Sequence, residues 1–187
     1  MMPAEFGATP WGLAWLRTIE STSTAAPNAL LPKARSIARN HAVTLTTGTG
    51  RVDADVAVSG AVHRVRIDVP PWPEQTRAEV QRLVAKALAD NRGLAVGDLP
   101  DTLAADLRHR DIGIAVEPDE RSAACDCRTR RRPCVHILAT IYTLTQLIDE
   151  RPVLAIELRS SGAEVAAPPD PDWIALTELD AAGFYGA

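Results

Sequence analysis

The chain has 187 residues, of which 46% are hydrophobic and 24% are charged, and its formal net charge is −4. This length and composition predict one globular domain, or one domain with a small satellite and a tail, and they exclude a chain that is disordered throughout. The acidic balance excludes a protein whose whole surface coats nucleic acid, so any such contact must come from a local basic patch.

Hydrophobic spacing predicts two helices near the start of the chain. Trp11 and Trp15 share one stripe of a helix over residues 10–20, and Thr9 precedes it as the expected N-cap. We expect both tryptophans to lie in the core. A second, shorter helix is predicted over residues 31–39.

Three segments then alternate apolar and polar residues, over 43–47, 51–58 and 63–69. This period of two, with glycine-containing connections, predicts an antiparallel β-meander with one wet face. Arg64 and Arg66 point outward in this pattern. They either extend a basic surface across the sheet or, more simply, form its wet face together with neighbouring aspartates.

The segments after the sheet predict mainly helices, over 75–90, 100–109 and 134–150, from apolar residues at i, i+3, i+4 and i+7. A short strand is predicted over 112–116. The predicted fold class is therefore α+β, with a small antiparallel meander packed against helices.

All three cysteines lie in the stretch CDCRTRRRPCVH. Cys125 and Cys127 point to one side of an extended backbone, and Cys134 and His136 stand where a loop enters the helix over 134–150. A Cys₃His set is a common ligand set for structural zinc, and four protein ligands leave no open position for catalysis. The alternative, three free cysteines beside a surface histidine, is the weaker interpretation. The sequence predicts a structural Zn²⁺ site in a knuckle that leads into a helix.

The pattern C-x-C-x₆-C-x-H followed by a helix resembles the SWIM zinc finger. The wider chain is similar to small bacterial SWIM-finger proteins, through the opening helix PWGLAWLRTIE and the arginine-rich LPKARSIARNHAVTL. The resemblance implies zinc binding, contacts with DNA, RNA or protein, and association with SNF2-type helicases, transposases or recombination complexes. We expect three parts: an α+β domain over 1–117, the finger and its helix over 118–159, and a Pro-rich linker with an aromatic tail over 160–187.

The finger departs from many of its relatives by carrying arginines between its two ligand pairs. We call residues 128–133 the arginine loop. Three thiolates bound to Zn²⁺ leave the site with a charge of about −1, and Asp126 adds about −1. Four arginines therefore leave the knuckle positive by roughly two charges. They either donate N–H groups to the thiolates, bind phosphates of DNA or RNA, dock an acidic protein, or are simply solvated. The candidate phosphate-binding residues are Arg128, Arg130, Arg131 and Arg132, with Arg121 nearby.

The tail carries Trp173, Phe184 and Tyr185 beyond the Pro-rich linker. Such a segment either docks a partner or folds back on the chain's own sheet edge or on the apolar VLAIEL stretch.

The N-terminus lacks a basic start followed by an apolar core, and no apolar run approaches the ~20 residues that span a bilayer. We therefore expect a cytoplasmic protein with no membrane partner. His41, His63 and His109 are isolated and are interpreted as surface or strand-face residues.

No set of residues for catalysis stands out, which predicts a protein that is not an enzyme. The leading hypothesis is a zinc-binding accessory protein that contacts nucleic-acid backbone and docks a DNA- or RNA-processing partner such as an SNF2-type helicase. The alternative is a protein–protein adaptor without nucleic-acid binding.

Overall fold

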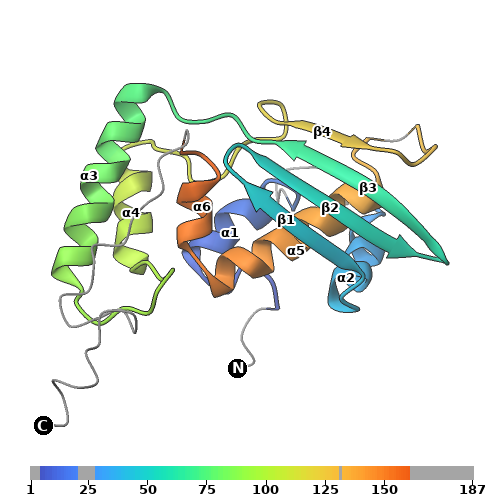
Figure 1. Cartoon of the computed structure of the whole chain (residues 1–187), viewed down its shortest axis with the longest axis horizontal. Helices are drawn as coiled ribbons and strands as arrows, with labels where there is room; N and C mark the ends of the chain where they lie inside the picture. The colour runs from blue at the N-terminus through green and yellow to red at the C-terminus, as the bar shows by residue number, and fades with distance from the viewer. Residues whose placement is uncertain (1–4, 21–27, 131, 161–187) are drawn as a thin grey trace, which may run out of the picture.

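A computed structural model of the chain describes residues 5–20, 28–130 and 132–160, and Figure 1 shows how they are arranged. They form a four-stranded sheet and six helices, which confirms the predicted α+β class. None of these helices combines the length and apolarity needed to cross a bilayer. The elements are α1 Pro10–Arg17, α2 Leu31–Arg39, β1 Val43–Gly48, β2 Arg51–Val58, β3 Ala61–Asp68, α3 Glu74–Asp90, α4 Asp101–His109, β4 Ser122–Cys125, α5 Val135–Glu150 and α6 Val153–Glu157.

The sheet has the order β1-β2-β3-β4, and every neighbouring pair is antiparallel. Val52 lies opposite Ile67 on the inner face, where both side chains are fully buried. Asp53 lies opposite Arg66 on the outer face, and their side chains form an ion pair of 2.9 Å. The alternation in the sequence therefore predicted the two faces correctly, and the outward arginines share the wet face with aspartates.

The prediction of a strand over 112–116 is wrong. The alternating apolar side chains of this segment are buried, as in a strand, but its carbonyl groups pair with side chains. The Gly113 carbonyl accepts hydrogen bonds from the Trp72 indole (3.1 Å) and from the Arg159 guanidinium (2.7 Å). The fourth strand is β4, which pairs with β3 directly before the cysteines; its sequence, SAAC, has no large apolar residue that would predict a strand.

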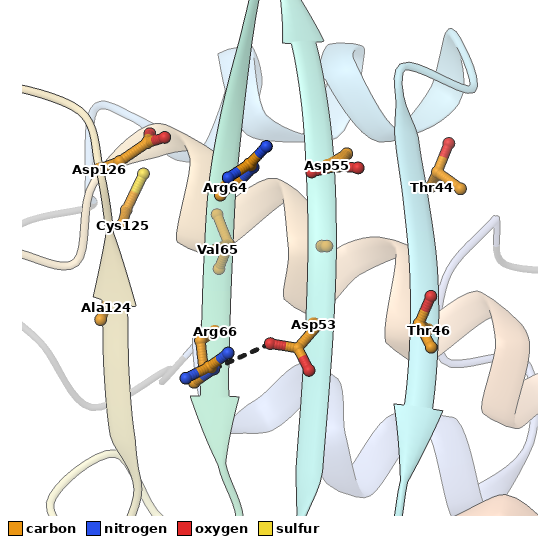
Figure 2. Close-up of a pocket in the computed structure, with 11 residues that line it drawn as sticks. Thr44, Thr46, Asp53, Asp55, Arg64, Val65, Arg66, Ala124, Cys125 and Asp126 are labelled. Atoms are coloured by element: carbon orange, nitrogen blue, oxygen red, sulfur yellow. Dashed lines mark hydrogen bonds and ion pairs between the residues drawn. The ribbon is translucent and has the colours of Figure 1, made fainter.

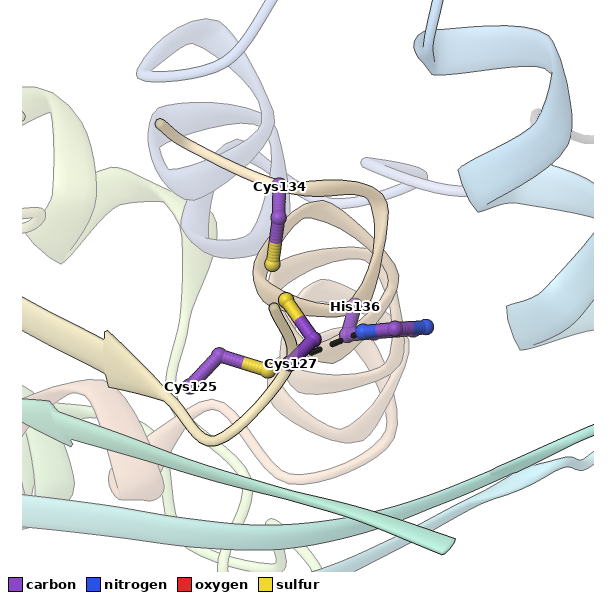
Figure 3. Close-up of side chains that lie close together, drawn as sticks. All are labelled: Cys125, Cys127, Cys134 and His136. Carbon is purple, nitrogen blue, oxygen red and sulfur yellow. Dashed lines mark hydrogen bonds between the residues drawn. The ribbon is translucent and has the colours of Figure 1, made fainter. Parts of the chain in front are cut away.

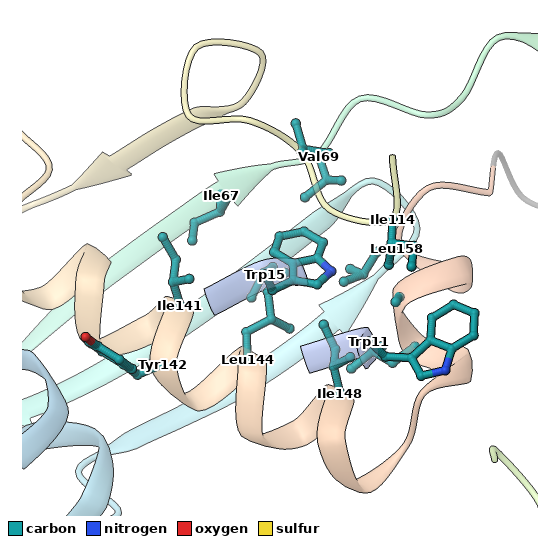
Figure 4. Packing of buried hydrophobic residues seen from close by; sticks show 14 of the residues in the cluster. Trp11, Trp15, Ile67, Val69, Ile114, Ile141, Tyr142, Leu144, Ile148 and Leu158 are labelled. Atoms are coloured by element: carbon teal, nitrogen blue, oxygen red, sulfur yellow. The ribbon is translucent and has the colours of Figure 1, made fainter. Parts of the chain in front are cut away.

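Helix α5 lies at the centre of the fold, in contact with the strands of the sheet and with α1, α2 and α6. The predicted seam of Ile137, Ile141, Leu144 and Ile148 is buried, and so are most other positions in its first three turns. Figure 4 shows Ile141, Leu144 and Ile148 of this seam packed beside Trp15, which is fully buried as predicted. Each such side chain contributes about 1.5–3 kcal/mol when it leaves water.

The C-terminal end of α5 holds the start of α1. The Asp149 carboxylate accepts hydrogen bonds from the backbone N–H groups of Gly7 (2.7 Å), Ala8 (3.0 Å) and Thr9 (2.8 Å), and from the Thr9 hydroxyl. Thr9 is the N-cap of α1, as predicted, and accepts from the Gly12 N–H. A carboxylate beside a helix N-terminus is favoured by the helix dipole. A Cβ at Gly12 would lie 2.2 Å from this carboxylate, so any other residue there would displace Asp149 from its hydrogen bonds.

The predicted 118–159 segment and the predicted 1–117 domain contribute to one hydrophobic core. Val52 and Trp11 belong to the same buried cluster as Ile141 and Leu154. The division of the chain at these boundaries stays a prediction, as does the 160–187 tail, most of which lies outside the described residues.

We expect Asp149→Ala to lower the free energy of unfolding by about 2 kcal/mol, because three backbone N–H groups lose a charged acceptor. Urea unfolding of the zinc-loaded protein, followed by circular dichroism, measures this loss. Glu150→Ala is the matched control, since Glu150 is exposed on the next position of the same helix. Equal midpoints for the two variants would contradict the role of Asp149.

Candidate metal centre

The two predicted ligand pairs meet at one point between β4 and α5. Cys125 is the last residue of β4 and lies opposite Val65, on the inner face of the sheet. Cys127 follows on the same side, as the C-x-C spacing predicts. Figure 3 shows the three sulfur atoms and the His136 ring converging, and the four ligand atoms all lie within 4.8 Å of one another.

The second pair comes from the entrance of α5. Cys134 is the N-cap of the helix and has extended dihedral angles (φ −79°, ψ 169°), whereas His136 lies in the first turn. This change of backbone conformation lets two residues so close in sequence face one ion, as predicted. Both side chains are buried, so the site is anchored in the core on this side.

The geometry fits zinc. The Cys125 Sγ and His136 Nδ1 atoms are 3.6 Å apart. Zinc–sulfur and zinc–nitrogen bonds of ~2.3 and ~2.0 Å in a tetrahedron place two such ligands roughly 3.6 Å apart. Three thiolates and one imidazole are a ligand set that zinc prefers, and they fill its four positions. The site is therefore a structural zinc centre.

The surroundings shift the pKa values of two of the thiols in opposite directions. Burial raises the pKa of Cys125 to about 12, and the nearby Cys134 contributes to that increase. Burial also acts to raise the pKa of Cys127, but hydrogen bonds, first among them that from the Thr129 N–H, lower it overall. Zinc supplies the positive charge that thiolates need, so its binding must release thiol protons.

The histidine is held in the form that binds metal. Burial lowers the pKa of His136, and the neighbouring His63 lowers it further, against an opposing effect of Asp126. The imidazole is therefore neutral near pH 7, with a ring nitrogen free to coordinate.

One arginine of the loop lies against the ligands. Arg132 donates to the Cys127 sulfur (3.8 Å), to the Thr129 carbonyl (2.7 Å) and to the Cys125 carbonyl (3.4 Å). A guanidinium beside a thiolate stabilises its negative charge. Arg132 therefore has the role that was expected of N–H donors near the thiolates.

The other predicted phosphate-binding residues divide into three kinds. Arg128 and Arg130 are exposed. Arg121 donates to the Thr18 hydroxyl (2.9 Å) and to the Val116 carbonyl (3.1 Å), so its guanidinium is turned into the protein. Phosphate binding stays a prediction for all of them. Arg131 lies outside the described residues, and so do the three predicted partner-docking residues Trp173, Phe184 and Tyr185.

Sequence reasoning missed His63, which it interpreted as an isolated surface or strand-face residue. Its ring stacks on the His136 ring, with centroids 4.1 Å apart and planes at 18°. Its Nδ1 atom lies 3.4 Å from a carboxylate oxygen of Asp126. The sequence did contain a signal for this residue. His63 has the same inward parity as Val65 and Ile67 in β3, where a polar residue is unusual.

The outer face of the sheet beside the metal centre is hollowed. Figure 2 shows this concavity, of about 320 Å³, with charged side chains from β2 and β3 on its floor. Asp53 is paired with Arg66, whereas Arg64 lies opposite Asp55 in the ladder. With Asp126 at its rim, the concavity is lined by three carboxylates and two guanidinia.

We expect Cys127→Ser to abolish stabilisation by zinc, because one of four ligands is lost. For the wild type, zinc at about 100 times its Kd raises the free energy of unfolding by about 2.7 kcal/mol. Thermal unfolding with and without zinc, together with the metal content of the purified protein, measures this difference. Thr129→Ala, in the same loop, is the control and keeps the response. A Cys127→Ser protein that still binds zinc stoichiometrically would contradict the ligand set.

We expect zinc affinity to weaken as the pH falls, because protons compete with zinc for the thiolates and burial raises the pKa of Cys125 to about 12. Release of that one thiol proton on binding makes Kd rise by about 10-fold per unit between about pH 8 and pH 6. The lowered pKa of His136 acts in the same direction, because the unfolded chain then holds that proton more tightly and stability is lost on acidification. Competition with a chelating dye measures Kd, and a Kd independent of pH would contradict this account.

Comparison with known proteins agrees with this geometry. A family model described as SWIM zinc finger matches residues 109–144. The uncharacterized protein Rv2102 of Mycobacterium tuberculosis is 30% identical over 139 residues, which are 72% of this chain and 50% of that protein. The chain thus spans about half the length of this relative. No solved structure matches. The chain therefore carries a zinc finger of the SWIM family, with Cys125, Cys127, Cys134 and His136 as its ligands.

Proposed function

We propose that this chain is a non-enzymatic accessory module that contacts nucleic-acid backbone through the arginine loop and docks a DNA- or RNA-processing partner, such as an SNF2-type helicase. Zinc has a structural part in this function, since four protein ligands leave it no position for a substrate. The helicase is suggested by the resemblance of the finger, and the nucleic acid by the loop.

The observation that carries the proposal is the state of Arg128 and Arg130. Both side chains are exposed, and within the described residues neither has a hydrogen-bond or ion-pair partner. The metal centre holds both ends of their loop, so the charges are displayed from a restrained backbone. Guanidinium groups presented in this way suit the bidentate contacts that arginine makes with phosphate.

A third cation lies near the metal centre. Lys33, exposed on α2, is close enough to affect the pKa of His136, after the larger effects of burial, His63 and Asp126. The two other basic residues of α2 are engaged differently: Arg35 pairs with Glu20, and Arg39 pairs with Glu5. Lys33 is therefore the basic residue of α2 that we include with the arginine loop in the proposed basic surface.

The mixed charge of the neighbouring sheet face favours a second candidate, a protein–protein adaptor. The concavity on this face carries Asp53, Asp55 and Asp126 beside Arg64 and Arg66. A net charge near −1 repels a phosphate backbone, whereas alternating charges suit a protein partner with a complementary pattern. In this alternative the arginine loop binds acidic side chains of the partner.

We expect the zinc-loaded chain to bind fluorescent DNA or RNA in a manner that weakens with salt. Arg128→Ser combined with Arg130→Ser should reduce the affinity for duplex and lower the log–log salt slope by about 1.8, because two phosphate contacts are lost. Arg132 is left intact, since it lies against the zinc ligands. Titration of single- and double-stranded DNA and RNA by fluorescence anisotropy at several salt concentrations measures both quantities.

The matched control combines Arg92→Ser with Arg108→Ser, which removes the same charge from exposed arginines at the α3–α4 end. An equal loss in both double variants would assign the binding to overall charge and contradict a site on the loop. No binding by the folded, zinc-loaded wild type would sink the nucleic-acid proposal and leave the adaptor. A partner complex that persists at high salt would then support the adaptor.

A further inference from the structure

The two halves of the finger are connected by a second route besides the metal ligands. Asp126 lies between the first two cysteines, and its carboxylate meets the Nδ1 atom of His63 at 3.4 Å. His63 in turn stacks on His136 at a centroid distance of 4.1 Å. A chain of side-chain contacts therefore runs from the C-x-C turn, through β3, to the first turn of α5.

We propose that His63 is a positioning residue for the metal centre, which holds the His136 ring in the orientation that ligates zinc. His136 can rotate about its side-chain bonds, and only some orientations aim Nδ1 at the sulfur atoms. The nearly parallel His63 ring restricts that rotation. It comes from β3, which pairs with β2 at His63 and with β4 from Val65 onward, and this ladder makes it a rigid support.

Asp126 fixes the supporting ring. Its carboxylate contacts the Nδ1 atom of His63, so this contact and packing together set the plane of the His63 ring. Asp126 is itself half exposed, but its backbone N–H donates to the Arg64 carbonyl, which extends the β3–β4 pairing past the end of β4. The residue between two zinc ligands is thereby tied to the strand that carries His63.

The position of His63 argues against a role in packing alone. Its parity in β3 is that of Val65 and Ile67, which are buried and apolar, whereas the alternate residues Val62, Arg64 and Arg66 are exposed. An aliphatic residue would fill the same position at the end of the strand. An imidazole there gains a partner on each side, Asp126 and His136, and supporting groups of this kind orient metal ligands and commonly govern metal affinity.

This inference concerns the metal centre and does not depend on what the arginine loop binds. We expect His63→Ala to raise Kd for zinc by about 10- to 100-fold in the full-length chain. His63→Phe keeps a ring to stack on His136 and should stay within about threefold of the wild type. Competition with a chelating dye measures Kd, and circular dichroism of the zinc-loaded proteins checks the fold.

The absorption spectrum of the Co²⁺-substituted protein gives a second readout. Intense d–d bands report tetrahedral coordination, so the wild type and His63→Phe should share a spectrum, whereas His63→Ala should lose intensity as His136 leaves its ligating orientation. His109→Ala, which replaces an exposed histidine at the C-terminal end of α4 that is not a zinc ligand, is the control and should change neither readout.

Two results would overturn the proposal. A His63→Ala protein with the Kd and the Co²⁺ spectrum of the wild type would show that His136 needs no support. A loss of zinc binding as complete as that expected for Cys127→Ser would instead make His63 a ligand. If His63→Ala fails to fold even with zinc, His63→Phe decides: a folded protein with a 10-fold or greater rise in Kd would refute the stack.

Discussion

The zinc-mediated connection between β4 and α5 is the constraint on which the rest of the structure depends. β4 has only four residues and lies at an edge of the sheet, so its hydrogen bonds to β3 hold it weakly. α5 is the helix around which the hydrophobic core forms. Because β4 and α5 bind the same ion, the short strand is attached to the most buried helix. The N-terminal end of α5 is thereby held against the sheet.

The same helix is held at its other end by charge. Its N-cap and first turn each provide one zinc ligand, and its last turn provides Asp149, which binds the backbone before α1. Two electrostatic contacts, one with a cation and one with N–H dipoles, thus set the position of an otherwise apolar helix. Apolar packing is not directional, whereas these contacts are, so they determine the register in which α5 lies between the sheet and α1.

Much of the fold could be predicted because its signals are local. The two-residue period of β2 and β3 gave the correct inner and outer faces, and the cysteine spacing identified the ligands of the metal centre. The failures came from contacts distant in sequence. The segment over 112–116 looks like a strand, but Trp72 and Arg159 occupy its Gly113 carbonyl, and no pattern within the segment reveals them.

The candidate site shows the same division. Cys125 and His136 could be recognised from their spacing, because all four ligands lie within one short segment of the sequence. His63 lies in another element, and only the antiparallel register brings it to His136. Arg121 illustrates the converse: it is close in sequence to the arginine loop, yet its guanidinium turns to Thr18. Whether a charged side chain faces solvent or protein depends on tertiary packing that single-sequence patterns do not contain.

The described residues of the arginine loop are exposed, and the loop begins and ends at zinc ligands. Coordination by Cys127 and Cys134 fixes the two ends of the loop, and its described side chains lie outside the hydrophobic core. Arg132 is the member tied to the ligands. The side chains of Arg128 and Arg130 therefore belong neither to the zinc ligands nor to the hydrophobic core. Substitutions at these two positions can alter the charge and length of the displayed side chains while the ligands and the core stay in place.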